Sequence, residues 1–302
     1  MDAVNRIEQA LQGAIARAEV PGCPPSLAAA MRHAVFPRGA RVRPRLCLAV
    51  AAACGDPAPP LSDAAAAAIE LLHCASLVHD DLPCFDNAST RRGHPTVHRA
   101  FGEPLAVLAG DALIVAAFEV LARAFAAAPD RFPCLVEVVA RGVAAPHGII
   151  AGQAWESEPR IPVITYRRTK TGALFEAAGA AGAIAAGSDP APWRTFGERI
   201  GEAYQVADDI HDVAGDAVSL GKPTGRDSAL GRPNAAHDLG VGGSRKLLGQ
   251  LLDEALDEMP PCRHPERIRA WVLETAALLM GAGRGARLSY DDSEHERESR
   301  SA

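Results

Sequence analysis

Apolar positions along the chain recur with the three-to-four-residue spacing of α-helices. The first twenty residues place Val4, Ile7, Leu11 and Ile15 on one stripe, with polar and acidic residues between them, as in a helix that packs through one face. Residues 104–128 are almost wholly apolar and rich in alanine, the strongest helix former. We find no alternation of period two long enough to predict a strand. The pattern therefore predicts an all-α protein.

Proline- and glycine-rich breaks divide this pattern into roughly ten helices of one domain, residues 1–283. Asp63 is the predicted N-cap of one of them. A loop rich in glycine, proline and lysine runs to about residue 233, and the polar tail 284–302 is expected to be disordered. The predicted helical ranges are 1–20, 26–35, 42–54, 62–81, 104–128, 134–158, 164–187, 190–214, 243–257 and 264–283.

Composition narrows the functional classes. The net charge of −6 argues against a nucleic-acid binder and against a polybasic membrane anchor. Seven cysteines are dispersed without a CxxC pair, which favours reduced thiols in the cytosol over disulfides or a zinc site. The longest apolar runs carry charged residues and the N-terminus lacks the order of a signal peptide. We expect a cytoplasmic protein with no transmembrane segment.

Two clusters of aspartates are the strongest chemical signal. The first, in HDDLPCFD (79–86), contains Asp80, Asp81 and Asp86. The second, DDIHD, contains Asp208, Asp209 and Asp212. Residues four apart on a helix share a face, so Asp208 and Asp212 repel each other unless a cation lies between them. Dense carboxylate oxygens suit magnesium, which is usually bound together with substrate phosphates.

Basic residues follow each acidic cluster. Arg91 and Arg92 come about ten residues after Asp81, and Lys222 comes ten residues after Asp212, with Arg226 just beyond. Arginine binds phosphate through paired hydrogen bonds, and lysine does so as a point charge. Two such sets facing one cavity would hold a polyphosphate through bridging metal ions.

These motifs resemble the trans-isoprenyl diphosphate synthase (polyprenyl synthetase) family, from about residue 36 to about residue 235. The sequence is most similar to the bacterial geranylgeranyl diphosphate synthases of carotenoid pathways. The matching motifs are RGARVRP (38–44), ELLHCASLVHDD (70–81), DDLPCFD (80–86), RRG (91–93), GQAWE (152–156), KTG (170–172), YQ (204–205), DDIHD (208–212) and GKPTGRD (221–227).

The resemblance implies an all-α isoprenoid synthase fold around a deep central cavity, a homodimer, and three magnesium ions. It implies that the six aspartates bind metal, three from each wall: Asp80, Asp81, Asp86, Asp208, Asp209 and Asp212. It assigns the allylic diphosphate to Arg91, Lys170, Thr171, Gln205 and Lys222. It assigns the diphosphate of isopentenyl diphosphate to Arg41, His73 and Arg92. The residues implied to act in catalysis are Asp80, Asp81, Lys170, Asp208 and Lys222.

The implied reaction joins isopentenyl diphosphate head-to-tail to an allylic diphosphate by ionisation, condensation and elimination. In such enzymes, side chains just before the first aspartates limit the product length. Ala75 and Ser76 are small, so we predict a twenty-carbon product, with Phe118 as the floor of the prenyl channel.

Two positions depart from the family pattern. Ala40 stands where a lysine is expected, so isopentenyl binding is weaker or Arg38 or Arg43 compensates. Glu156 stands where an aspartate is expected. Alternatives are a farnesyl diphosphate synthase with a shallower channel, a terpene cyclase, or a non-catalytic partner subunit of another synthase. Both aspartate motifs and the isopentenyl-site residues argue against the last two. The sequence leaves open the allylic primer, the product distribution and the downstream pathway.

Overall fold

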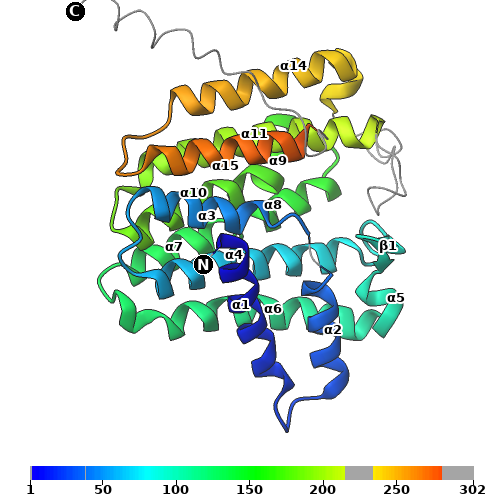
Figure 1. Cartoon of the computed structure of the whole chain (residues 1–302). Helices are drawn as coiled ribbons and strands as arrows, with labels where there is room; N and C mark the ends of the chain where they lie inside the picture. Colours follow the sequence, from blue (N-terminus) through cyan, green and yellow to red (C-terminus); the bar gives the residue numbers. More distant parts are fainter. Residues whose placement is uncertain (1, 38, 215–233, 281–302) are drawn as a thin grey trace, which may run out of the picture.

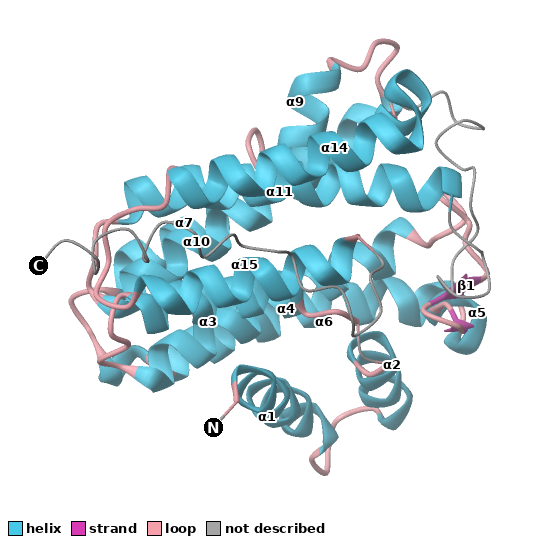
Figure 2. Cartoon of the chain, turned by 45° about the horizontal axis from the view of Figure 1, so that its top comes forward, coloured by secondary structure: helices cyan, strands magenta, loops and turns pink. Residues whose placement is uncertain are grey.

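The computed structural model describes residues 2–37, 39–214 and 234–280, and within these ranges the chain is almost entirely helical (Figures 1 and 2). The expectation of an all-α fold is confirmed. The first part contains α1 (Ala3–Ala16), a 3₁₀ turn (Arg17–Glu19), α2 (Pro25–Val35), α3 (Val42–Ala53), α4 (Pro59–Asp80), the strands β1 (Thr90–Arg91) and β2 (His94–Pro95), α5 (Val97–Phe101) and α6 (Glu103–Arg123). The second part contains a 3₁₀ turn (Phe125–Ala127), α7 (Phe132–Arg141), α8 (Ile149–Ala154), a 3₁₀ turn (Trp155–Ser157), α9 (Val163–Arg167), a π-helical segment (Arg168–Gly172), α10 (Ala173–Ala186), α11 (Pro190–Ala214), α14 (Ala235–Asp257) and α15 (Pro265–Leu279).

Helix α10 forms the centre of the bundle. All of its residues except Glu176 are buried, because a helix that is apolar on every side must be surrounded by protein. Its neighbours include α3, α4, α7 and α11. They can approach closely because α10 is built of alanine and glycine: a Cβ atom at Gly179 would lie only 2.2 Å from the carbonyl oxygen of Trp193 on α11. Any larger residue at position 179 would push these two helices apart.

Helices α4 and α6 pack along each other on one side of the bundle (Figure 1). Both α4 and the segment Glu103–Ala127 are long and apolar enough to cross a membrane, which is weak evidence on its own. In α4, 78% of the apolar stretch is buried inside the bundle, as expected of a core helix; in the α6 segment the share is only 39%. Helix α6 thus presents an apolar outer face.

Several boundaries differ from those that the sequence predicts. Asp63 is not the N-cap of α4, which begins at Pro59; instead Asp63 lies within the helix and accepts a hydrogen bond of 2.7 Å from Arg6 on α1. The predicted helix 134–158 is broken between α7 and α8, where Gly142, Pro146 and Gly148 interrupt it. Helix α14 begins at Ala235, ahead of the predicted start at 243, with Asn234 as its cap.

Two local features are missing from the prediction. Strands β1 and β2 form an antiparallel hairpin after α4, too short for an alternating pattern to be seen. The predicted helix 164–187 contains the π-helical segment, which carries Lys170 and Thr171. π-Helical turns are rare and often occur at functional sites.

Candidate active site

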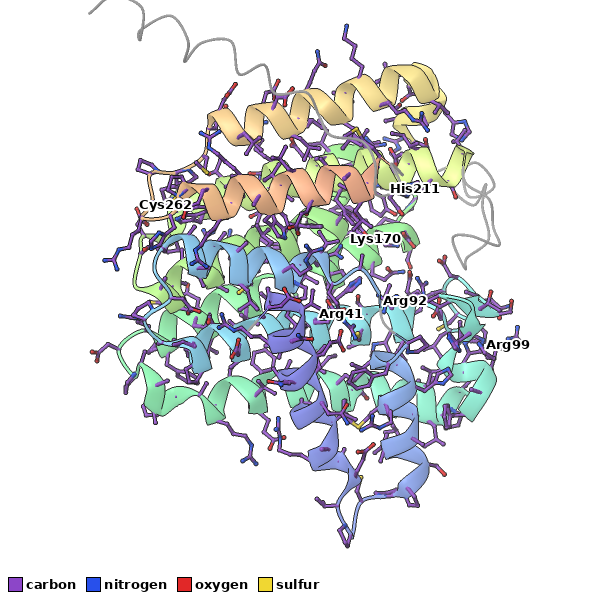
Figure 3. The ribbon with its side chains drawn as sticks, in the orientation of Figure 1. Arg41, Arg92, Arg99, Lys170, His211 and Cys262 are labelled. Atoms are coloured by element: carbon purple, nitrogen blue, oxygen red, sulfur yellow. The ribbon has the colours of Figure 1, made fainter. Side chains whose placement is uncertain are left out.

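A cavity of about 890 Å³ opens at the end of the bundle that carries the β-hairpin. Its wall is formed by the start of α3, the C-terminal part of α4, the loop and hairpin after it, α8, the π-helical segment and the C-terminal part of α11. Figure 3 shows Lys170, His211 and Arg92 at this end of the molecule and Cys262 at the opposite end. Both aspartate clusters contribute to this one cavity.

Asp80 and Asp86 form the first acidic group, together with Glu156 from the turn after α8. One oxygen from each of these three carboxylates lies within 4.8 Å of the other two. The chain turns back after α4, where the amide of Asp86 donates to the carbonyl of Asp80 at 2.9 Å. Burial raises the pKa of Asp80, opposed by the positive charge of Lys170 and supported by the negative charge of Asp86.

This group has the chemistry of a magnesium site. Oδ1 of Asp80 is buried and has no hydrogen-bond partner among the described residues; the ammonium of Lys170 lies 3.7 Å away. A buried carboxylate oxygen without a donor is costly unless a cation binds it. Hard oxygen ligands of this kind are those that Mg²⁺ prefers. The residues present therefore fit a magnesium ion.

Asp81 faces the other way. Its carboxylate accepts hydrogen bonds from the guanidinium of Arg91 at 2.6 and 2.8 Å, and it is not part of the cavity wall. Successive residues on a helix point about 100° apart, which places Asp81 away from the cavity wall that Asp80 lines. In this arrangement Asp81 holds Arg91, which does line the cavity, and metal binding by Asp81 stays a prediction.

The second cluster divides in the same manner. Asp208 and Asp212, four residues apart on α11, both line the cavity. Asp209 is fully buried away from it. Its carboxylate accepts from Nε2 of Gln205 at 2.8 Å, from Arg167 at 3.1 Å and from the amide of Ala235 at 2.7 Å. These donors hold the Asp209 carboxylate away from the cavity wall, and metal binding by Asp209 stays a prediction.

Lys170, Thr171 and Gln205 all lie on the cavity wall. The hydroxyl of Thr171 donates to Oε1 of Gln205 at 2.6 Å, which joins the π-helical segment to α11. Lys170 extends between the carboxylates of Asp80 and Glu156. The segment can sit close to α8 because Gly152 has no side chain; a Cβ atom there would lie 2.4 Å from the Cα atom of Lys170.

A basic pocket occupies another part of the cavity wall, formed by Arg43, His73 and Arg92 with Arg91 beside them. The guanidinium of Arg43 stacks on Phe175 at 4.5 Å from the ring centre, and its Nε atom has no hydrogen-bond partner among the described residues. The same holds for the buried Nδ1 of His73. Burial, reinforced by the charges of the surrounding arginines, lowers the pKa of His73 well below its usual value. The imidazole is therefore neutral near pH 7.

Arg41 lies outside this pocket. Its buried guanidinium pairs with Glu70 at 2.7 Å and Glu8 at 3.0 Å, and also donates to the carbonyl of Val35. These contacts hold Arg41 away from the cavity wall, and diphosphate binding by Arg41 stays a prediction. Arg43, named in the sequence only as a substitute for the lysine missing at position 40, lines the cavity, whereas Arg41, the other described arginine of RGARVRP, does not.

The comparisons with known proteins agree with this geometry. The model of the polyprenyl synthetase family matches residues 24–255. The chain belongs to the polyprenyl synthetase family. It is 54% identical to a geranylgeranyl diphosphate synthase of Cereibacter sphaeroides over 284 residues, which cover 94% of this chain and 99% of that protein. It is 51% identical to the corresponding enzyme of Rhodobacter capsulatus, covering 91% of this chain and 96% of that one.

Solved structures show the same fold. The geranyltransferase of Helicobacter pylori, complexed with magnesium and isoprenyl diphosphate, superposes with a TM-score of 0.74 at 30% identity and covers 91% of this chain and 97% of that one. The geranylgeranyl pyrophosphate synthetase of Pyrococcus horikoshii gives a TM-score of 0.76 at 28% identity, covering 93% and 96%. The resemblance seen in the motifs is confirmed. As a polyprenyl synthetase, the chain is a prenyltransferase that condenses isopentenyl diphosphate with allylic diphosphates.

The side chains predicted to set product length are not placed alike. Ser76 lines the cavity, whereas Ala75 is fully buried and does not. Phe118, on α6, packs against the core and is also absent from the cavity wall. The apolar wall next to the acidic group is instead formed by Leu77, Ile149 and neighbouring residues. Ala75 and Phe118, which are predicted to limit product length, therefore do not contact the cavity directly.

Some predicted residues lie outside the part of the chain that the structure describes. These are Lys222 and Arg226 after the second aspartate motif, Arg38 before α3, and the tail 284–302. Two residues to which the motifs assign no role, Gln153 and Tyr166, also line the cavity. Both donate hydrogen bonds to Glu156. Gln153 belongs to the matched motif GQAWE, but no motif includes Tyr166.

Proposed function

We propose that this polyprenyl synthetase makes geranylgeranyl diphosphate. The observation that carries the proposal is one cavity of about 890 Å³ that combines two pairs of aspartates, a basic pocket and an apolar wall. Those three parts match the metal-bound diphosphate, the second diphosphate and the growing prenyl chain of the reaction. Two relatives more than half identical over nearly the whole chain carry the name geranylgeranyl diphosphate synthase. The small side chain of Ser76 on the cavity wall leaves room for a long product.

Four aspartates would hold magnesium, two from each cluster. Asp80 and Asp86 would do so from the end of α4, and Asp208 and Asp212 from α11, all of them on the cavity wall. Bound there, magnesium would neutralise the negative charge that develops on the leaving diphosphate. The buried Asp80 oxygen without a hydrogen-bond donor supports this assignment. Three ions is the number that the family resemblance implies.

The basic residues would divide between the two diphosphates. Lys170 stands beside Asp80, so we assign it to the allylic diphosphate together with Arg91, Thr171 and Gln205. Arg43, His73 and Arg92 form the basic pocket, which we assign to isopentenyl diphosphate. Two buried nitrogens in that pocket, on Arg43 and His73, have no donor–acceptor partner among the described residues and are available to oxygen atoms of a ligand.

The reaction follows from this division. The allylic carbon–oxygen bond breaks, leaving a carbocation and a diphosphate whose added charge is stabilised by cationic side chains fixed in advance. The double bond of isopentenyl diphosphate then attacks the cation, forming the new carbon–carbon bond. A proton leaves the adjacent carbon to an oxygen of the departing diphosphate, which restores a double bond. Leu77 and Ile149 on the cavity wall keep water away from the cation during these steps.

A homodimer formed through α6 is part of this proposal. Val107, Leu108 and Val115 are 42%, 53% and 68% exposed, and their spacing of seven and eight residues places them on one face of the helix. A second copy of the chain would bury this apolar face. Sedimentation analysis should therefore show a dimer, and Val115→Glu should shift it toward the monomer. A monomeric wild-type protein at micromolar concentration would contradict the proposal.

We also assign the enzyme to the cytoplasm and to carotenoid synthesis. All seven cysteines are free, which suits a reducing compartment. The pathway assignment is supported by the similarity of the motifs to bacterial synthases of carotenoid pathways. Cell fractionation, and carotenoid analysis of a strain that lacks the gene, test these two statements separately.

A product assay tests the central proposal. The purified protein is incubated with labelled isopentenyl diphosphate, magnesium and each allylic primer of five, ten or fifteen carbons. We expect a twenty-carbon diphosphate as the main product. A fifteen-carbon product would instead indicate a farnesyl diphosphate synthase, and no turnover with any primer would favour a partner subunit.

A further inference from the structure

Tyr166 is a buried aromatic residue at the edge of the active site that none of the family motifs accounts for. It lies on α9, four residues before Lys170, and only 8% of its surface is exposed. Its hydroxyl donates a hydrogen bond of 2.6 Å to Oε1 of Glu156. Glu156 is the position at which the family pattern has the shorter aspartate. The tyrosine and the longer carboxylate thus meet at a point where this chain departs from its family.

Glu156 is fixed by donors from three separate segments. Tyr166 contributes from α9, Gln153 from α8 through a hydrogen bond of 3.2 Å to Oε2, and Lys170 from the π-helical segment through an ion pair with Oε1. Oε1 therefore serves both the tyrosine hydroxyl and the lysine ammonium. The position of this oxygen determines where the ammonium stands.

The same ammonium also faces the first aspartate cluster. Nζ of Lys170 lies 3.7 Å from Oδ1 of Asp80 and 5.8 Å from the centre of the Tyr166 ring. It is therefore bounded by two carboxylates and one aromatic ring. A glutamate has one more rotatable bond than an aspartate, so an extra contact is needed to hold its carboxylate in a single position. The hydroxyl of Tyr166 supplies that contact.

We propose that Tyr166 is a positioning residue which, by fixing Glu156, sets the place of the Lys170 ammonium beside Asp80. The inference rests on the proposed function in one respect: it takes Lys170 as a ligand of the allylic diphosphate. Without the hydroxyl, the Glu156 carboxylate loses one of these three donors and can shift, which moves Lys170 out of line with the diphosphate. The isopentenyl pocket, on a different part of the wall, is not affected.

The test is Tyr166→Phe, which removes the hydroxyl and keeps the ring beside Lys170. We expect the KM for the allylic diphosphate to rise roughly 10-fold or more, the lower end of the scale of one hydrogen bond to a charged group. The KM for isopentenyl diphosphate and the melting temperature should change little. Thr165→Val is the matched control, because Thr165 lies on the same helix but is exposed; its kinetics should equal those of the wild type.

A double-mutant cycle checks that the effect passes through Glu156. Because Glu156→Gln already removes the negative charge that attracts Lys170, adding Tyr166→Phe to it should cost much less than Tyr166→Phe alone. Glu156→Asp combined with Tyr166→Phe should recover part of the allylic affinity, since the shorter carboxylate needs less support. Fully additive effects in the cycle would overturn the inference.

Binding of inorganic pyrophosphate by calorimetry, with and without magnesium, gives a readout that does not require turnover. The magnesium-dependent component should weaken in Tyr166→Phe by a factor similar to the change in allylic KM, while the magnesium-independent component stays unchanged. Equal values for wild type and variant would overturn the inference. So would a uniform loss of both components together with a lower melting temperature, which indicates a purely structural role. If the wild type shows no turnover with any primer, the proposed function fails, and the pyrophosphate measurement still decides the role of Tyr166.

Discussion

Arg41 and Arg43, two residues apart in RGARVRP, are predicted to have opposite mutant phenotypes. The side chain of Arg41 is fully buried and pairs with Glu70, which is 2% exposed, and with the half-buried Glu8. Arg43 lines the cavity and stacks on Phe175. Replacing Arg41 should therefore damage folding, whereas replacing Arg43 should damage substrate binding.

The loss of stability expected for Arg41→Gln follows from the Glu70 carboxylate, which the substitution leaves without its cation. Burial alone would lower the pKa of the guanidinium, but Glu70 and Glu8 raise it above its usual value, so the arginine is charged in its pairs. Removing it leaves the Glu70 carboxylate buried without its cation, which typically costs about 3–5 kcal/mol of unfolding free energy. For a chain of 302 residues, this corresponds to a drop in melting temperature of roughly 5–8 °C.

Arg43→Gln should behave differently. We expect a melting temperature close to that of the wild type and a KM for isopentenyl diphosphate raised roughly 10- to 100-fold, as for the loss of a charge-assisted contact. The KM for the allylic primer should change little. Calorimetric melting and steady-state kinetics on the two variants give the comparison. The reasoning is refuted if Arg41→Gln is as stable as the wild type and shows the isopentenyl defect.

Three further comparisons of variants test other parts of the site. Ser76→Phe should shift the product from twenty toward fifteen carbons because position 76 lines the cavity, whereas Ala75→Val should affect stability more than product length. Chromatography of the products measures the chain length, and the opposite pattern would support Ala75 as the residue that limits it. Because the pKa of His73 is lowered, the unfolded chain binds a proton below about pH 6.5 that the folded chain does not. As the pH falls from 7 to 5, the wild type should therefore lose unfolding free energy relative to His73→Gln, by up to about 1 kcal/mol per pH unit. The same pH dependence of stability in both proteins would contradict this. Asp80→Asn should weaken magnesium binding measured by calorimetry, whereas Asp81→Asn should mainly raise the allylic KM by releasing Arg91; equal losses of magnesium affinity would contradict the assignment.

The helical fold could be predicted because its signals are local. Alanine-rich segments with helical periodicity favour one conformation, and α10 is so uniformly small and apolar that burial on every side follows. The errors occur where tertiary contacts override the local pattern. Asp63 is a good N-cap residue, but α4 extends past it to Pro59, and Asp63 pairs with Arg6, 57 residues away in the sequence. Such a partner cannot be recognised from a local window.

The site could be predicted to the level of motifs but not of single side chains. The order of the motifs brings both acidic clusters and Lys170 to one cavity. A motif does not state which of two adjacent aspartates faces that cavity, because this depends on the rotation of the helix about its axis. The same uncertainty affects Arg41 and Arg43, because Arg41 precedes α3 in a left-handed backbone conformation and Arg43 lies within the helix. Tyr166 was missed because nothing in its sequence neighbourhood marks it as a partner of Glu156.

The two aspartate motifs share a division of roles that explains why each contains adjacent acids. In the first, Asp80 faces the cavity while Asp81 binds Arg91, a residue of the cavity wall. In the second, Asp208 faces the cavity while Asp209 binds Gln205, which in turn accepts from Thr171. One acid of each pair thus lines the cavity, and the other fixes the polar residues assigned to the allylic diphosphate. Because neighbouring residues share one backbone, the metal ligands and the diphosphate ligands are held in a constant relation to each other. A single aspartate in each motif could bind metal but could not provide this coupling.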